Sequence, residues 1–149
     1  MSEKSKFMLR AIELSIQSAK SKGGPFGCVI VRDNKIIAEG FNQVTANNDP
    51  TAHAEILAIR KACDVLKNQR LTNCSMYVTL EPCPMCAAAI SNARISKLFF
   101  GVEDYKSGGV YNGPKIYSHK QCHHIPEVFD GIGKTESEKI IKDFFKSRR

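Results

Sequence analysis

Two short motifs about thirty residues apart constrain this chain more than any other feature of its sequence. The first is His53-Ala54-Glu55 and the second is Pro82-Cys83-Pro84-Met85-Cys86. An imidazole and two thiolates supply three ligands of a tetrahedral zinc ion, and a site with three protein ligands keeps its fourth position for water, as catalytic zinc sites do. A fold that uses both motifs must bring two distant segments to one point. Glu55 would then lie beside the ion as the base for that water.

Each motif alone has other interpretations. A lone histidine is often an ordinary core residue, and a Cys-x-x-Cys pair can be a redox motif or half of a structural zinc site. A redox pair of the thioredoxin kind would follow the first strand of a βαβ unit, whereas this pair follows more than eighty residues. A structural site would need a fourth ligand, and Cys74 and Cys122 stand in no paired ligand spacing. We therefore expect a catalytic zinc site at His53, Cys83 and Cys86.

The local patterns place these ligands at the starts of two helices. Apolar residues recur around and after His53 at helical spacing, which predicts a helix with His53 in its first turn; they are Ala52, Ile56, Ile59, Cys63 and Leu66. Residues 76–80 resemble a buried strand, and Pro84 suits the first turn of a helix that runs to about Ala93. Two helix N-termini that face one ion would stabilise both thiolates through their unpaired N–H groups and dipoles.

The remaining segments alternate between helical and strand patterns. A hairpin is expected around Asp33-Asn34, and residues 103–124 are polar, contain glycine and stay unassigned. The other expected elements are an opening helix with Met8, Ile12, Ile16 and Ala19 that ends near Gly23-Gly24, strands at residues 26–31, 36–41, 97–101 and 125–129, and a closing helix with an apolar stripe of Ile140, Ile141, Phe144 and Phe145. The pattern predicts a single domain over residues 1–149 of the α/β class. Its architecture would be a three-layer αβα fold, a five-stranded mixed sheet with helices on both faces.

Composition narrows the class of protein further. No stretch of the 149 residues approaches the ~20 apolar residues of a membrane span, and the first helix lacks the apolar run of a signal peptide. We therefore expect a cytoplasmic protein without membrane contact. Four cysteines lie outside the second motif and are expected to be buried thiols; they are Cys28, Cys63, Cys74 and Cys122.

The charge is basic and unevenly distributed. The chain has 22 lysines and arginines against 15 acidic residues, a net charge of +7, which suits a polyanionic partner. Many charge excesses are no more than a solvated surface. Here, however, the segment 139–149 combines five basic residues and one acidic residue with an apolar helix face. We expect phosphate contacts from Lys142, Lys146, Arg148 and Arg149.

The two motifs together match the H-x-E…P-C-x-x-C signature of zinc-dependent nucleobase deaminases. Over nearly its whole length the chain resembles the cytidine deaminase-like superfamily and, within it, the bacterial tRNA-specific adenosine deaminases. The resemblance is carried by residues 48–56, residues 77–83, the loop Asp104-Tyr105-Lys106-Ser107-Gly108-Gly109 and the ending from Cys122-His123-His124 to the basic tail. It implies hydrolysis of the wobble adenosine of a tRNA anticodon to inosine, one Zn²⁺ per subunit, an anticodon stem-loop as partner, and a homodimer whose partner subunit helps to shape each pocket.

The same resemblance suggests which residues contact the substrate. Asn42 matches an asparagine that contacts the base in this family, although a turn is the alternative role for such a residue. The target nucleotide must leave its stack to reach a buried metal, and Asp104 and Lys106 are candidates for contacts with its neighbours. His119, His123 and His124 stay unassigned.

One segment departs from the tRNA-enzyme pattern. Lys22-Gly23-Gly24-Pro25-Phe26-Gly27 is similar to a loop of bacterial guanine deaminases, and it puts Phe26 near the base in place of a smaller aliphatic residue. A free purine, most of all guanine, is therefore the alternative substrate. A third hypothesis is a non-catalytic, zinc-stabilised RNA-binding module. Glu55 argues against it, because a structural site has no use for a carboxylate beside an open metal position.

Overall fold

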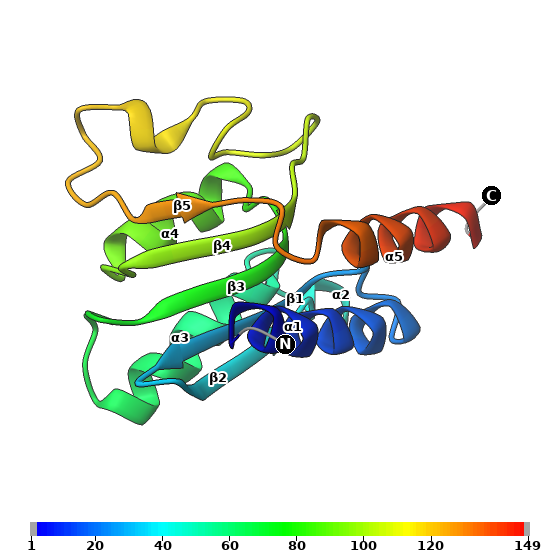
Figure 1. The fold of residues 1–149 in the computed structure, drawn as a ribbon, viewed down its shortest axis with the longest axis horizontal. Helices are drawn as coiled ribbons and strands as arrows, with labels where there is room; N and C mark the ends of the chain where they lie inside the picture. The colour runs from blue at the N-terminus through cyan, green and yellow to red at the C-terminus, as the bar shows by residue number, and fades with distance from the viewer. Residues whose placement is uncertain (1–2, 148–149) are drawn as a thin grey trace.

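The computed structural model describes residues 3–147 of the chain, with side chains over residues 6–146. A five-stranded mixed sheet lies between two layers of helices (Figure 1), which confirms the expected α/β class and αβα layering. In chain order the elements are α1 (Glu3–Lys20), β1 (Gly27–Arg32), β2 (Lys35–Phe41), α2 (Val44–Asn47), α3 (Ala54–Leu66), β3 (Ser75–Leu80), α4 (Pro84–Asn92), β4 (Lys97–Val102), the 3₁₀ turn η1 (Ile116–Ser118), β5 (Glu127–Phe129) and α5 (Lys134–Ser147).

The strand direction reverses twice along the order β2-β1-β3-β4-β5, on either side of β1. Strand β1 pairs antiparallel with β2 and with β3, whereas β3, β4 and β5 run parallel. The β1–β2 hairpin turns at Asp33 and Asn34, whose φ angles of 51° and 60° give the two left-handed residues that a tight two-residue hairpin turn needs. The hairpin expected at this position is therefore confirmed.

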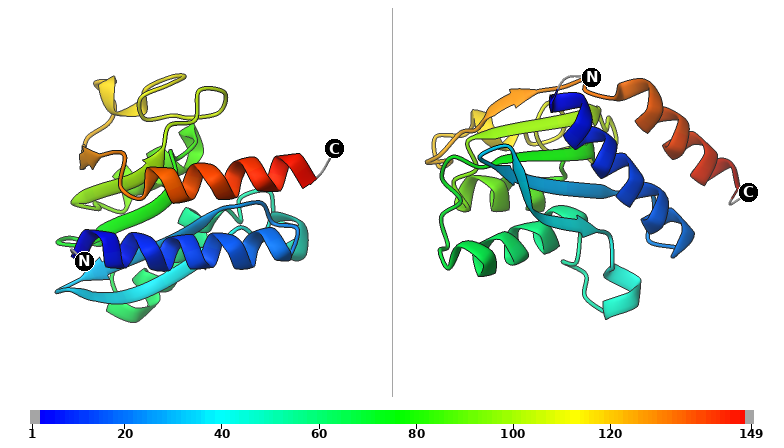
Figure 2. Two further views of the ribbon diagram at one scale, coloured as in Figure 1. Left: turned by 45° about the vertical axis from the view of Figure 1, so that its right-hand side comes forward. Right: turned by 60° about the horizontal axis from the view of Figure 1, so that its bottom comes forward.

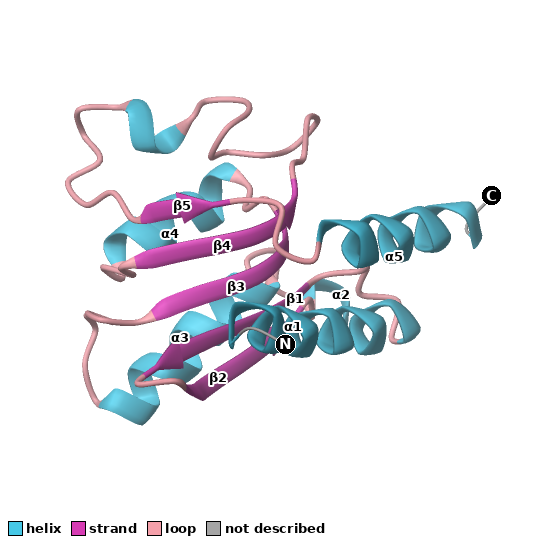
Figure 3. Cartoon of the chain, viewed as in Figure 1, coloured by secondary structure: helices cyan, strands magenta, loops and turns pink. Residues whose placement is uncertain are grey.

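The strands form one sheet with helices on both sides (Figure 3), and alternation of side chains along the strands divides the core between its two faces. Val29, Tyr77 and Phe99 point towards α1 and α5, while Ile30, Val78 and Phe100 point towards α3 and α4. On the α1 side, rings on neighbouring parallel strands stack, with 4.4 Å between the ring centres of Tyr77 and Phe99. The two further views in Figure 2 show α1 and α5 together on one face and α3 and α4 on the other.

Two predicted helix faces differ from the structure. In α3 the fully buried residues of the sheet-facing side are Ala54, Ala58 and Ala62, whereas four members of the predicted apolar set are only half-buried, namely Ile56, Ile59, Cys63 and Leu66. Gly40 of β2 is the cause, because a Cβ atom there would overlap the carbonyl oxygen of Ala54, so the backbones approach too closely for larger side chains. In α1 the prediction for Ile16 was wrong, since this residue is 40% exposed.

The cysteines outside the second motif divide into two groups. Cys28 and Cys74 are fully buried, as expected, and burial raises the pKa of the Cys28 thiol. Cys63 and Cys122 are only half-buried, so the prediction was wrong for them. Cys63 packs at the margin of the core, and Cys122 lies in a segment outside the strands and helices. Among the helices that the structure describes, none has the length and apolar character that a membrane span requires.

Candidate metal centre and active-site pocket

The helices α3 and α4 begin side by side, and their first residues carry the two motifs. His53 and Cys83 each precede a helix as its N-cap, with extended backbone at φ −70°, ψ 156° and φ −70°, ψ 171°. Neither side chain caps its own helix, so the imidazole and the sulfur are free to bind something else. His53 thus lies one residue before the first helical turn in which it was predicted. Pro84 occupies the first position of α4, as expected, and Cys86 lies in that first turn.

The three candidate ligands converge on one point. The Nδ1 atom of His53 lies 3.6 Å from Cys83 Sγ and 3.5 Å from Cys86 Sγ. A tetrahedral zinc ion with bonds of about 2.3 Å to sulfur and about 2.0–2.1 Å to nitrogen holds these atoms about 3.6 Å apart. The donor set and its spacing therefore fit zinc. Within residues 3–147, no further cysteine, histidine, aspartate or glutamate joins the cluster.

The two cysteines considered as a fourth ligand lie elsewhere. Cys74 is part of the core between the sheet and the α3–α4 layer. Cys122 Sγ lies 3.3 Å from Ser91 Oγ and 3.2 Å from the carbonyl oxygen of His124, on the far side of α4. The cluster thus has three protein ligands among the described residues, which is the pattern of a catalytic zinc site.

The ionisation of the cluster is strongly perturbed. Hydrogen bonding with Cys86 is the main cause that lowers the pKa of the Cys83 thiol to about 4, so Cys83 is a thiolate at neutral pH. The same hydrogen bond, followed by burial, raises the pKa of Cys86. A hydrogen bond with Cys83 raises the pKa of His53. Cys83 is then a thiolate, while a proton remains on the cluster. A cation that binds there would displace this proton.

Glu55 lies beside the cluster in the first turn of α3 and is 7% exposed. Burial raises the pKa of its carboxyl group above the ordinary value. A carboxyl group whose pKa moves towards neutrality can both take up and release a proton during a reaction. The geometry therefore places a carboxyl group with a raised pKa next to the candidate metal position.

A cavity of about 660 Å³ opens onto the cluster. Its floor is formed by the metal-site residues and the ends of β3 and β4, and its rim by residues 103–107 and one side of α5. The lining residues are Phe26, Asn42, His53, Ala54, Glu55, Val78, Leu80, Glu81, Cys83, Val102, Glu103, Asp104, Tyr105, Lys106, Ser107, Glu138, Ile141, Lys142 and Phe145. An apolar floor with a few converging polar groups is the usual construction of a small-ligand site.

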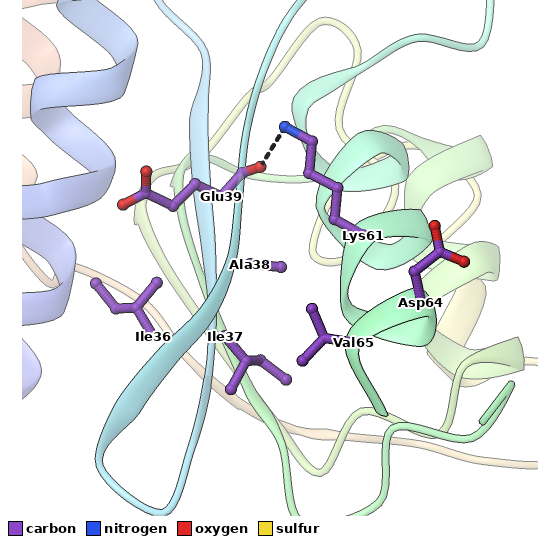
Figure 4. Close-up of a pocket in the computed structure, with 7 residues that line it drawn as sticks. All are labelled: Ile36, Ile37, Ala38, Glu39, Lys61, Asp64 and Val65. Atoms are coloured by element: carbon purple, nitrogen blue, oxygen red, sulfur yellow. Dashed lines mark hydrogen bonds between the residues drawn. The ribbon is translucent and has the colours of Figure 1, made fainter. Parts of the chain in front are cut away.

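A second hollow of about 630 Å³ lies between β2 and α3 (Figure 4). Its polar groups are Glu39, Lys61 and Asp64, and the Lys61 ammonium donates to the Glu39 carbonyl oxygen at 3.2 Å. Among the residues that the structure describes, no cluster of metal ligands lies there. The chemistry therefore belongs to the cavity above the cluster.

Residues 1–102 match the cytidine and deoxycytidylate deaminase zinc-binding region. The chain belongs to this deaminase family. It is a hydrolytic deaminase that acts on a nucleobase, as expected from the motifs. It is 45% identical to a tRNA-specific adenosine deaminase of Agrobacterium fabrum, in a match that covers 100% of this chain and 98% of the relative.

Two further comparisons locate this deaminase within its family. Its structure is similar to one from studies of A-to-I editing by tRNA:A34 deaminases at the wobble position of transfer RNA, with a TM-score of 0.89 and 44% identity over 91% of this chain and 98% of that chain. It is also 53% identical to a guanine deaminase of Bacillus subtilis, but over 65% of this chain and 63% of the relative.

The predicted base contacts of the deaminase both line the cavity. Phe26 follows Gly24, whose φ of +82° and lack of a side chain let the Phe26 ring fold back, since a Cβ atom there would lie 2.5 Å from the ring. The Asn42 side chain donates to the carbonyl oxygen of Gly23 and accepts from the backbone N–H of Val44 at 3.3 Å. Asn42 thus fixes the loop and lines the cavity wall, and its contact with the base stays a prediction.

Asp104 and Lys106 lie at the rim of the deaminase cavity. The Asp104 carboxylate accepts from the backbone N–H groups of Lys106 at 3.1 Å and Ser107 at 2.9 Å, so it closes the turn that presents its neighbours. Tyr105 between them is 80% exposed. Contacts of these side chains with nucleotides stay a prediction.

The closing helix α5 does not carry the single apolar stripe that was expected. Ile140 packs into the core beneath α1, whereas Ile141 and Phe145 turn towards the cavity. Lys142 lines the cavity and Lys146 is exposed on the same helix. Arg148 and Arg149, also predicted as phosphate contacts, lie outside the described residues.

Sequence reasoning missed Glu81, the residue before Pro82 at the cavity floor. Glu81 is 3% exposed, and its carboxylate accepts from the backbone N–H of Asp104 at 3.1 Å, of Val110 at 3.0 Å and of Tyr111 at 2.9 Å. Its partners lie more than twenty residues downstream in a segment without periodicity. The signal available in the sequence was a charged residue at the end of a strand expected to be buried.

Proposed function

We propose that this deaminase converts the wobble adenosine of a tRNA anticodon to inosine. The observation that carries the proposal is the match over the full length of the Agrobacterium fabrum tRNA-specific adenosine deaminase, which covers 98% of that protein. We propose further that each subunit binds one zinc ion, that the protein acts as a homodimer, and that it works in the cytoplasm, where its tRNA substrate would be found.

The reaction adds one water molecule across a C–N bond. Oxygen bonds to the ring carbon that carries the exocyclic amine, the bond from that carbon to nitrogen breaks, and ammonia leaves, so adenosine and water give inosine and ammonia. Zinc held by His53, Cys83 and Cys86 would supply an acidified water molecule. Glu55 would take one proton from this water and pass it to the adjacent ring nitrogen, and would then carry the second proton, from the new hydroxyl group on the ring carbon, to the departing amine.

The rim of the cavity supports a polynucleotide rather than a free base. Tyr105 and Phe145 are 80% and 55% exposed, and each has a lysine nearby at the same rim, Lys106 and Lys142. Exposed rings stack on unpaired bases and lysines bind phosphates, so this combination is typical of sites for flexible single strands. A free purine would leave these groups without a function.

A second candidate function is the deamination of guanine to xanthine. Two observations favour it: the aromatic Phe26 in the cavity wall, and the 53% identity with a guanine deaminase of Bacillus subtilis. The identity gives weaker support, because the match leaves about a third of either protein uncovered. The adenosine proposal therefore has priority.

Incubation of the zinc-loaded protein with two substrates separates the candidates. One is an anticodon stem-loop with adenosine at the wobble position, and the other is free guanine. Matched controls are a stem-loop with that adenosine moved by one position and the variant Glu55→Gln. Nuclease digestion and mass spectrometry should detect inosine in the first stem-loop alone and no xanthine. Xanthine without inosine would overturn the proposal in favour of guanine.

A further inference from the structure

The loop at the rim of the cavity is built around one buried carboxylate. Besides the three backbone N–H groups already described, the Glu81 carboxylate accepts from the backbone N–H of Asn112 at 3.2 Å and from its side-chain amide at 2.7 Å. Three of these donors, from Val110, Tyr111 and Asn112, are consecutive and converge on one oxygen atom. Successive N–H groups that face a single point form an anion-binding nest, here occupied by the protein's own side chain.

Two glycines are required for this arrangement. A Cβ atom on Gly108 would overlap Glu81 Oε2, and one on Gly109 would lie 2.5 Å from the backbone nitrogen of Pro84. The backbone N–H of Gly109 also donates to the carbonyl oxygen of Pro82 at 2.8 Å. The loop therefore lies directly on the segment 81–84, which contains the metal ligand Cys83.

The other side-chain contacts of the loop lie away from its rim, where the Tyr111 ring packs edge-on against Phe100 with 5.3 Å between ring centres and the Tyr111 hydroxyl donates to Asp130 at 3.4 Å. The rim residues of the loop are polar or exposed, and Val110 is the residue of segment 103–112 that enters the hydrophobic core. A charged carboxylate that accepts several N–H groups makes stronger bonds than a neutral acceptor, and its loss would leave buried donors without partners. The position of Tyr105 and Lys106 at the rim thus depends on Glu81.

We propose that Glu81 is a positioning residue for substrate binding, which fixes the rim loop 103–112 relative to the metal site. Glu81 does not take part in the chemical step, because its carboxylate is occupied by the loop. The inference rests on the proposed function for its kinetic consequence, but the order of the loop itself can be measured without any substrate.

The kinetic test compares Glu81→Gln with the wild-type holoenzyme on the wobble-adenosine stem-loop. Glutamine keeps the size of the side chain but turns an amide group towards the N–H donors. KM should rise about tenfold or more while kcat changes by less than about threefold and zinc content is unchanged. Glu39→Gln is the matched control, since Glu39 also accepts strong hydrogen bonds but lies away from the cavity. A Glu81→Gln variant that loses kcat by a comparable factor while its KM stays unchanged would overturn the proposal.

Hydrogen exchange tests the loop directly. Amides of residues 104–112 should exchange about tenfold faster in Glu81→Gln than in wild type, while those of α1 stay unchanged. Unchanged exchange in the loop would overturn the proposal. If Glu81→Gln does not fold, Gly108→Ala displaces the carboxylate without removing any polar group and should change KM and exchange in the same direction. A wild-type enzyme without activity on the stem-loop would refute the proposed function, while exchange would still decide the role of Glu81.

Discussion

At the scale of single residues, the site depends on two side chains that precede helices without capping them. An N-cap side chain commonly bonds to the first N–H groups of its helix, but His53 and Cys83 leave these groups free. The N–H groups and dipoles of α3 and α4 therefore point at the metal position and favour negative charge there. Glu55 is the second residue of α3 and shares this environment.

Glu55→Gln is expected to abolish turnover without loss of metal. The amide keeps the shape of the side chain but cannot take a proton from water, and general-base catalysis is worth about 10²–10⁴-fold in rate. Single-turnover inosine formation and zinc content should be measured on the same preparation. A variant that retains more than about a tenth of the wild-type rate would exclude Glu55 as the proton carrier.

The three candidate ligands could be placed at helix starts from the sequence because the signals are local: helical spacing after His53, and Pro84 beside Cys83 and Cys86. Glu81 could not be predicted in the same way. Its role exists only once a loop more than twenty residues downstream has folded back over it, and neither periodicity nor turn chemistry indicates that fold. The prediction for Ile16 was wrong for a similar reason, because the sheet and α5 decide which face of α1 is buried.

At the scale of elements, close packing of α3 on β2 sets the position of the metal site. The sequence predicted the helix correctly but not its buried face, because the absent side chain of Gly40 favours alanines over larger residues at the contact. Ala54 at this contact lies between His53 and Glu55. The packing of α3 on β2 therefore affects the positions of both side chains.

Gly40→Ala should therefore destabilise the protein and impair catalysis together. The added methyl group would overlap the Ala54 carbonyl oxygen and lie 3.0 Å from the Ala58 nitrogen. Overpacking of this kind costs about 1–3 kcal/mol. Urea unfolding and stem-loop deamination should both show the loss. Gly131→Ala is the control, because its φ of +79° strains the backbone although a Cβ atom there meets nothing within 4 Å, so it should lose stability but keep its activity; equal activity of the two variants would contradict this account.

An ion pair joins α1 to the edge strand β2. The Arg10 Nε and guanidinium nitrogen donate to the two carboxylate oxygens of Glu39 at 2.6 and 2.9 Å. This hydrogen bonding is the main cause that lowers the pKa of Glu39. Because the pKa is lower in the folded state, the pair stabilises the protein above the unfolded pKa of glutamate and loses this effect as pH falls through the folded pKa.

Glu39→Gln should consequently destabilise the protein at pH 7 but hardly at acidic pH. Both side chains are more than a third exposed, so the expected loss at pH 7 is about 0.2–1 kcal/mol. Urea unfolding of both proteins at pH 7 and at about pH 3 measures the difference, which should shrink as Glu39 is protonated. A difference that is equal at both pH values, or larger in acid, would assign the effect to packing.

At the scale of the whole molecule, a net charge of +7 and the lysines of α5 give the cavity rim an electrostatic role. Association with an anticodon stem-loop should weaken steeply with salt, since each phosphate contact releases counterions. Lys146→Ala should reduce the slope of log K against log salt concentration by about 1, without a change in kcat. Lys97→Ala, at the opposite end of β4 from the cavity, is the matched control. Equal salt slopes for the two variants would show that the phosphates do not contact Lys146.

The central claim is that a zinc ion bound by three side chains, with one position open for water, lies beside Glu55. Anomalous diffraction from crystals of the native protein at the zinc absorption edge tests it most directly. We predict one peak about 2.3 Å from the sulfur atoms of Cys83 and Cys86 and about 2.0–2.1 Å from His53 Nδ1, with a solvent molecule as the fourth ligand. No peak at that position, or a fourth protein side chain bound to the metal, would contradict the account.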